Sequence, residues 1–279
     1  MKIIQADQIT AAVRKAFLAA CIAPGQDVDC ALRQAYQAES SPCGREILRQ
    51  LLENNSIAKQ ENIPSCQDTG MAVVYLDIGQ DVYIDGGFVE DAVNEGVRRA
   101  YADGYFRKSV LTAIGRENTR DNTPAIIHTK IVPGDGLKII AMPKGFGSEN
   151  MSAIKMLKPS DGREGIVNFI VEAAQNAGGC PCPPVVLGVG IGGTFEYAAY
   201  MAKRQLLRPL GSMNTEAQLA ELEAELKHKI NALGIGPMGL GGDTYCLAVH
   251  IDQYHTHLAG MPVAVNFCCH ALRHCEVDL

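Results

Sequence analysis

Long apolar runs are missing from this sequence. No stretch of its 279 residues is long enough to cross a bilayer, and MKIIQADQIT at the start lacks the basic segment, apolar core and cleavage site of a signal peptide. Positive charge is not in excess either, because the net charge is -6 and acidic and basic residues are interspersed. Nucleic-acid binding needs a broad positive field. We therefore expect a cytoplasmic globular protein that binds neither a membrane nor nucleic acid.

A regular disulfide framework is also lacking. The chain has ten cysteines, well below the density of a small secreted disulfide scaffold, and their spacings are irregular. Reduced thiols are the expectation, and in a reducing compartment such thiols are available to hold a metal.

The pattern of apolar residues predicts an α+β protein. Helical spacing occurs over residues 89–101, 166–173 and 215–234, where the last segment has a leucine stripe, an apparent capping box of Thr215 and Gln218, and Gly234 after its end. The glutamates of that helix are expected to form a solvated face. Strand-like runs cover residues 72–79, 125–132, 137–143, 185–191 and 245–251.

These elements do not alternate strictly, so mixed, largely antiparallel sheets packed with helices are expected, with a mostly helical N-terminal region. Pro133, Gly134, Asp135 and Gly136 separate two of the strand-like runs and predict a hairpin between them. We expect a single domain over residues 1–279, in which residues 1–60 could form a helical subdomain.

Potential metal ligands are most dense near the C-terminus. The segment contains five of the seven histidines and four cysteines: Cys246, His250, His255, His257, Cys268, Cys269, His270, His274 and Cys275. Such groups can hold zinc tetrahedrally, but their spacing matches no standard zinc finger or ribbon. A structural zinc site in a non-catalytic binding subunit is one hypothesis.

Three other segments place unusual residues together. PSCQDTG, containing Cys66, reads either as a simple turn before a strand or as a polar turn whose groups are paired. GGCPCPPVVLGVGIGG contains Cys182 and several glycines but lacks the G-x-G-x-x-G register of a dinucleotide site. KGFGSEN, residues 144–150, could bind a carboxylate through backbone N–H groups or could be a plain strand-to-helix loop.

Taken in order, PSCQDTG, KGFGSENMS, CPPVVLGVGIGGTFE and PVAVNFCC resemble the α subunit of two-subunit class I fumarate hydratases and L-tartrate dehydratases. The resemblance extends from about Cys66 to the C-terminus. It implies a cluster-binding domain with a 4Fe-4S cluster held by only three thiolates, those of Cys66, Cys182 and Cys269, with one iron left open. Cys180 and Cys268 are adjacent alternatives to the second and third ligands.

The resemblance also implies roles for other residues. Gln67 and Asp68 correspond to substrate or water contacts, with Asp68 taken as catalytic, and Arg107 corresponds to a carboxylate clamp. His257 corresponds to an active-site histidine, with His255 as the alternative. Gly145 and Gly147 correspond to backbone contacts with the substrate.

Fused members of this family continue into a second domain that carries the rest of the active site, whereas the present sequence ends at HCEVDL. The resemblance therefore implies a separate β subunit and an α2β2 assembly. The implied reaction is reversible hydration of fumarate to (S)-malate, which the KGFGSEN string favours. Dehydration of L-tartrate to oxaloacetate is the close alternative.

Overall fold

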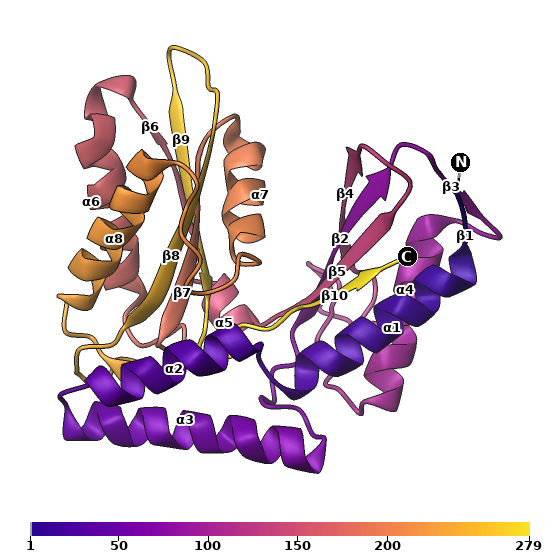
Figure 1. Ribbon diagram of the computed structural model, residues 1–279, viewed down its shortest axis with the longest axis horizontal. Coiled ribbons are helices and arrows are strands. Elements are labelled where there is room, and N and C mark those ends of the chain that lie inside the picture. Colours follow the sequence, from indigo (N-terminus) through magenta and orange to yellow (C-terminus); the bar gives the residue numbers. More distant parts are fainter. Residues whose placement is uncertain (1) are drawn as a thin grey trace. The chain divides into compact units, whose positions relative to one another are not determined.

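The computed structural model describes residues 2–279, and the chain folds into two compact units. Unit 1 comprises Met1–Pro24, Asn55–Phe146 and Arg273–Leu279, and unit 2 comprises Gly25–Asn54 and Gly147–Leu272. Each unit has its own four-stranded sheet (Figure 1) and its own apolar core. The α+β class and the mostly helical N-terminal region are confirmed. Residues 1–60 do not stand apart, since they contribute to both units.

Unit 1 is built on a four-stranded sheet with the order β10-β5-β2-β4. Its elements are β1 (Lys2–Gln5), α1 (Ala6–Ile22), β2 (Met71–Gly79), β3 (Val82–Asp85), α4 (Val89–Asp103), β4 (Ile126–Val132), β5 (Leu137–Lys144) and β10 (Cys275–Asp278). The short strands β1 and β3 pair in parallel. Alternate residues of β2 and β5 pack against the apolar stripes of α1 and α4, so both helices cover one face of the sheet.

The predicted hairpin is wrong. β4 and β5 do not pair with each other, because β2 lies between them, parallel to β4 and antiparallel to β5. The connecting turn passes over the end of β2, where Gly79 N–H donates to the Gly136 carbonyl at 2.8 Å and Asp81 N–H donates to the Gly134 carbonyl at 3.0 Å. Residues 72–76 of β2 are all buried, whereas β4 is mostly exposed. The most apolar strand therefore takes the inner position.

Unit 2 has a second four-stranded sheet with the order β6-β9-β7-β8. Its elements are α2 (Gln26–Ala38), β6 (Ala153–Leu157), α6 (Gly162–Ala177), β7 (Val185–Gly192), α7 (Phe195–Gln205), α8 (Ala217–Asn231), β8 (Cys246–Tyr254) and β9 (Met261–Cys268), with 3-10 turns at Pro159–Asp161 and Pro237–Gly239. Helix α3 (Pro42–Glu61) crosses the chain boundary between Asn54 and Asn55, and the short α5 (Phe146–Glu149) crosses the one between Phe146 and Gly147.

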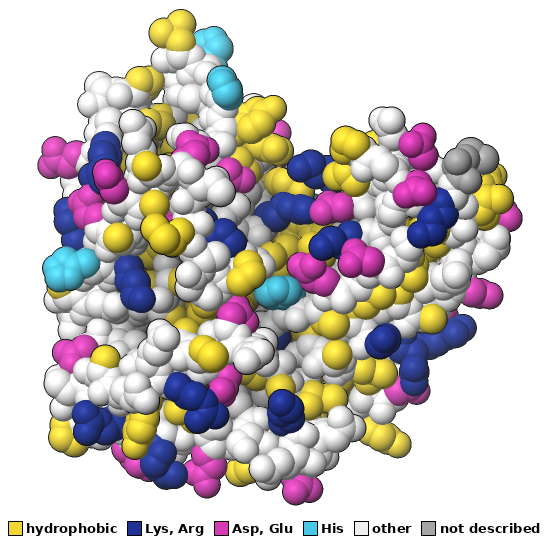
Figure 2. All heavy atoms as spheres, viewed as in Figure 1, with side chains coloured by type: hydrophobic (Ala, Val, Ile, Leu, Met, Phe, Trp, Pro, Cys, Tyr) yellow, Lys and Arg dark blue, Asp and Glu magenta, His cyan; other side chains and the backbone are white. Residues whose placement is uncertain are grey.

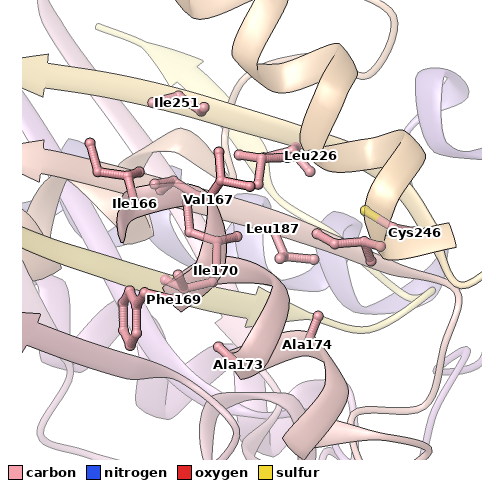
Figure 3. Packing of buried hydrophobic residues seen from close by; sticks show 14 of the residues in the cluster. Ile166, Val167, Phe169, Ile170, Ala173, Ala174, Leu187, Leu226, Cys246 and Ile251 are labelled. Atoms are coloured by element: carbon pink, nitrogen blue, oxygen red, sulfur yellow. The ribbon is translucent and has the colours of Figure 1, made fainter. Parts of the chain in front are cut away.

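Helices cover both faces of this sheet. α6 and α8 pack on one face, where Ile170, Leu226 and Leu187 meet in a continuous apolar core (Figure 3). α7 packs on the other face (Figure 1). The two glycines at the centre of β7 allow this, because a Cβ atom on Gly188 or Gly190 would overlap the carbonyl oxygens of Ala202 and Ala198 in α7. These glycines serve helix packing.

The leucine stripe of α8 is confirmed, since Leu219, Leu222, Leu226 and Ile230 are buried. The capping box is wrong: the helix begins at Ala217, two residues after Thr215, and its N-cap makes no side-chain hydrogen bond. Glu223 departs from the expected solvated face. It is 9% exposed, and its carboxylate accepts hydrogen bonds from Arg208 Nη1 and Nη2 at 2.8 and 2.7 Å.

Candidate active site

In unit 1, the PSCQDTG segment forms a polar turn between α3 and β2. Cys66 is partly exposed and Gln67 is exposed, and Cys66 Sγ lies 3.9 Å from Gln67 Oε1. Both carboxylate oxygens of Asp68 are engaged: Oδ1 accepts a hydrogen bond from Gly70 N at 3.0 Å and Oδ2 accepts one from Phe146 N at 2.9 Å. Asp68 thereby joins the cysteine turn to the KGFGSEN loop.

Buried donors fix the carbonyl groups of this turn. The hydroxyl of Tyr101 donates to the Thr69 carbonyl at 2.6 Å and lies 3.1 Å from the Gly70 carbonyl. Asn122 Nδ2 donates to the same Gly70 carbonyl at 3.2 Å. Burial raises the pKa of Tyr101 well above its usual value, so the phenol stays a donor. The guanidinium of Arg273 also donates to the Asp68 carbonyl.

Two glycines allow the turn and the loop to approach closely. Gly70 has φ +77°, and a Cβ atom there would lie 2.7 Å from the backbone of Lys144. A Cβ atom on Gly145 would lie 3.2 Å from Asp68 Oδ2. Gly145 therefore presents only backbone beside the carboxylate of Asp68.

Arg107 belongs to the same neighbourhood. Its carbonyl accepts a hydrogen bond from the Thr69 hydroxyl at 3.2 Å, and the residue is exposed. Unit 1 thus brings together five of the residues expected from the sequence: Cys66, Gln67, Asp68, Arg107 and Gly145.

In unit 2, Cys182 and Cys269 lie on neighbouring segments. Cys182 precedes β7 and Cys269 follows β9, and these strands pair antiparallel with Val186 opposite Cys268. The backbone N–H of His270 donates to the Cys182 carbonyl at 3.4 Å. Cys182 adopts φ +56°, an unusual conformation for a residue other than glycine.

Burial separates the candidate thiols from three of the other cysteines, Cys21, Cys246 and Cys268. Cys182 is exposed and Cys269 is partly exposed, whereas Cys268 is 4% exposed. Burial raises the pKa of the Cys21 and Cys246 thiols to about 12, so both remain protonated. Cys180 is exposed like Cys182, and exposure alone does not choose between these two.

The second half of KGFGSEN lies in unit 2. Ser148 is buried, and a Cβ atom on Gly147 would lie 3.9 Å from the Cys180 carbonyl oxygen. The carboxylate of Glu149 forms an ion pair with Lys203 of α7 and accepts a hydrogen bond from Asn266 Nδ2 at 3.0 Å. Since Asn266 is three residues before Cys269, this network joins the loop to the strand that leads to the cysteine.

The structure does not bring His257 together with this cysteine pair. His255 and His257 lie exposed on the connection between β8 and β9, where histidine side chains gather at the tip of the unit (Figure 2). The eight residues of β9 separate this connection from Cys269, which corresponds to about 26 Å at about 3.3 Å per residue. In this chain, His257 and Cys269 therefore lie at opposite ends of β9, and the catalytic role of His257 stays a prediction.

The other C-terminal histidines and cysteines are dispersed as well. His250 is 2% exposed, faces the Gln205 carbonyl at 3.2 Å and has its pKa lowered to about 4 by burial. Cys275 belongs to unit 1. Among residues 2–279, no group of three or more His, Cys, Asp or Glu side chains is placed to hold a metal ion. The nine C-terminal candidates for zinc therefore do not form one cluster.

Comparison with known proteins identifies the family. The family described as "Fumarate hydratase (Fumerase)" matches residues 10–278. The putative L(+)-tartrate dehydratase subunit alpha of Methanocaldococcus jannaschii is 44% identical over 272 residues, 95% of each chain. The L(+)-tartrate dehydratase subunit alpha of Escherichia coli (strain K12) is 33% identical over 251 residues, 88% of this chain and 82% of the relative. The chain belongs to the fumarate hydratase (Fumerase) family.

Membership of this hydro-lyase family confirms the resemblance seen in the four motifs. No helix among residues 2–279 is both long and apolar enough to span a membrane. The sequence did not reveal Tyr101, Asn122 and Arg273, which hold the cysteine turn of this fumarate hydratase family member. Their partners lie about 30 to 205 positions away in the chain, so no local pattern marks them.

Proposed function

We propose that the chain is the α subunit of a hydro-lyase that carries a 4Fe-4S cluster held by Cys66, Cys182 and Cys269. The observation that supports this best is the gathering of Cys66, Asp68, Arg107 and Gly145 from three separate motifs within unit 1. A turn that is only structural would not need a partly exposed thiol next to an exposed amide, with the exposed Arg107 on the segment whose backbone bonds to the turn.

The donor set fits such a cluster. Thiolate is the iron ligand of choice in these clusters, and the three proposed cysteines are the partly or fully exposed thiols in family motifs. Cys182 and Cys269 lie on adjacent segments, and Cys66 comes from the other unit. Cys21 and Cys246 fit less well, since both are buried and burial raises the pKa of their thiols to about 12. When bound, a cluster with three protein ligands supplies an open iron, a Lewis acid that helps hydroxide to leave.

The remaining chemistry belongs to side chains and backbone of the chain. The guanidinium of Arg107 suits a substrate carboxylate, because its planar fork matches the two oxygens. The amide of Gln67 and the backbone of Gly145 and Gly147 would orient the rest of the substrate. Asp68 is held by two backbone N–H groups, and its remaining lone pairs would orient water or accept a proton at Oδ1 or Oδ2. His257 stays the catalytic histidine that the resemblance implies, and it lies at the opposite end of β9 from Cys269 of its own chain.

We propose fumarate, hydrated to (S)-malate, as the substrate, on the strength of the KGFGSEN loop. L-tartrate, dehydrated to oxaloacetate, is the second candidate, because the relatives named above are described as tartrate dehydratase α subunits. Both are four-carbon dicarboxylates, so the carboxylate contacts serve either one. A site that hydrogen-bonds the additional hydroxyl of tartrate would discriminate strongly against substrates without it.

The description of both relatives as α subunits supports a β subunit partner, and we propose an α2β2 assembly. The test is to co-purify the chain anaerobically with its β subunit, determine iron and sulfide, and measure kcat/KM for fumarate, (S)-malate and L-tartrate. We expect iron, sulfide and a higher kcat/KM for fumarate. A complex that retains zinc and contains no sulfide would contradict the proposed cluster. A higher kcat/KM for L-tartrate than for fumarate would show that L-tartrate is the substrate.

A further inference from the structure

Arg273 is a buried arginine that contacts the cysteine turn of unit 1 on both sides of Cys66. Only 4% of the residue is exposed. Its Nη1 lies 3.5 Å from Ser65 Oγ, and its Nη2 donates to the Asp68 carbonyl oxygen. Ser65 precedes Cys66 directly and Asp68 follows two residues later, so one guanidinium spans the turn that carries the thiol.

The position of Arg273 in the chain adds to this contact. It lies four residues after Cys269, the third proposed ligand, and two residues before β10. β10 pairs with β5 in the sheet of unit 1, which fixes the backbone that follows Arg273. The guanidinium therefore connects a sheet-anchored segment to the turn.

Arginine suits this position better than lysine. Its planar group presents several N–H donors in a fixed geometry and can reach two acceptors at once, whereas a lysine ammonium is a point charge on a flexible stem. Burying a guanidinium is costly unless its donors are paired. A purely structural anchor could use a neutral donor, as Tyr101 and Asn122 do for the next two carbonyls of the same turn.

We propose that Arg273 is a positioning residue for the cluster: it fixes the direction of the Cys66 thiolate through Ser65 and Asp68 and places a buried positive charge beside the turn that carries this thiolate. This inference rests on the proposed cluster. Two effects follow and can be separated. Arg273→Lys keeps the positive charge but loses the planar group that reaches two acceptors at once. Arg273→Met loses both.

The test uses the full chain co-purified with its β subunit and reconstituted anaerobically. The readouts are iron and sulfide per chain, the rate of iron loss to a chelator, and the electron paramagnetic resonance spectrum of the oxidised three-iron form. Loss of a group that orients a metal ligand commonly weakens metal retention about 10–100-fold. We expect iron loss to be about tenfold faster in Arg273→Lys, faster again in Arg273→Met, and both spectra to change.

Two further variants keep the result interpretable. Ser65→Ala removes one acceptor without disturbing a buried charge, and we expect iron loss a few-fold faster than in the wild type. Arg45→Lys is the matched control, because Arg45 Nη2 also donates to a backbone carbonyl, that of Glu39, at 2.8 Å, but in unit 2. Its iron retention and spectrum should equal those of the wild type.

The outcomes separate the two proposals. A wild-type complex that binds no iron and sulfide overturns the cluster itself. A wild-type complex with a stable cluster, together with unchanged iron loss and spectra in Arg273→Lys and Ser65→Ala, overturns the positioning role alone. Equally fast iron loss in Arg45→Lys would also overturn the positioning role, since replacing any arginine of this kind would then weaken iron retention. If Arg273→Met does not fold, Arg273→Lys and Ser65→Ala still decide.

Discussion

At the scale of single residues, the cysteines divide by environment. Cys66, Cys182 and Cys269 are accessible, whereas Cys21 and Cys246 are buried with pKa values of about 12. Thiolates are the metal-binding form, so burial makes the second group less suited to bind a metal. Accessibility, combined with the four motifs, therefore supports the three proposed ligands over most of the other thiols.

We predict that serine at position 66, 182 or 269 abolishes iron retention after anaerobic reconstitution, because each substitution removes one of three ligands. Alanine at position 180 or 268 should leave iron and sulfide per chain unchanged. Loss of the cluster in Cys268→Ala, with normal content in Cys269→Ala, would show that the neighbour is the ligand.

Arg107→Lys should lower kcat/KM by about tenfold or more, since lysine keeps the charge but cannot form a planar two-point contact with a carboxylate. The measurement needs the complex with its β subunit and a full cluster. Arg33→Lys, on the exposed side of α2, is a suitable control. Kinetic constants equal to those of the wild type would make Arg107 an ordinary surface residue.

His250 makes the stability of the chain depend on pH. Burial and the nearby Arg208 lower its pKa to about 4, although Glu223 and Asp27 act in the opposite direction. The unfolded chain, with a pKa of about 6.5, binds a proton that the folded chain excludes. Stability from this residue is therefore complete above about pH 6.5 and falls as the pH drops, by about 2 kcal/mol at pH 5.

Urea unfolding of the α chain at pH 7.5 and pH 5 measures this effect. His250→Gln should flatten the pH dependence, and His228→Gln, at an exposed position of α8, should not. If the free energy of unfolding depends on pH equally in both variants, groups other than His250 cause the acid sensitivity.

At the scale of helices and strands, the periodicity of apolar residues predicted those elements that form because one face or one run of the segment is buried. The stripes of α4, α6 and α8 and the apolar runs of β2, β5, β7 and β8 appear where the sequence placed them. The hairpin prediction failed because pairing depends on which strand is most apolar, and β2 takes the place between β4 and β5. Glu223 is buried because Arg208, 15 positions away, pairs with it.

The same contrast holds for the candidate site: residues in local motifs were predicted, and residues whose partners are distant in the chain were not. The four motifs indicated the residues that supply chemistry, and unit 1 brings five of them together. Arg273 and Tyr101 escaped notice because a single buried arginine or tyrosine has no pattern of its own, and its partner is defined only after folding. His257 was assigned from the resemblance alone, and motif spacing carries no information on which end of β9 lies near the cysteines, so its role stays a prediction.

Gly190→Ala should destabilise unit 2 by about 2–3 kcal/mol, in the upper part of the range for overpacked cores, because the added methyl group meets the Ala198 carbonyl oxygen of α7. Urea unfolding of the α chain is the measurement. Gly260→Ala is the matched control, since a Cβ atom there has no neighbour within 4 Å. Equal free energies of unfolding for both variants would mean that α7 can shift to accommodate the methyl group without loss of stability.

At the scale of the whole molecule, the chain is long enough to fold by itself and is matched over most of its length by relatives described as α subunits. Its two units each have a buried core, and the match to the Methanocaldococcus jannaschii relative covers 95% of both chains. All three proposed cysteine ligands belong to this chain. We therefore expect that neither folding nor binding of the proposed cluster requires another chain.

We predict that the isolated α chain folds and binds the cluster but does not turn over substrate at a useful rate. Elimination of water needs a base placed opposite the departing hydroxyl, and the resemblance assigns that base and further carboxylate clamps to the β subunit. Lewis acidity alone supplies neither proton transfer nor full positioning of the substrate, and each missing contribution costs orders of magnitude in rate. The measurement is fumarate hydration by reconstituted α chain of known iron content, before and after adding the β subunit. Rapid turnover before the addition would require the base to lie within these 279 residues, and Asp68 would then be the first residue to substitute.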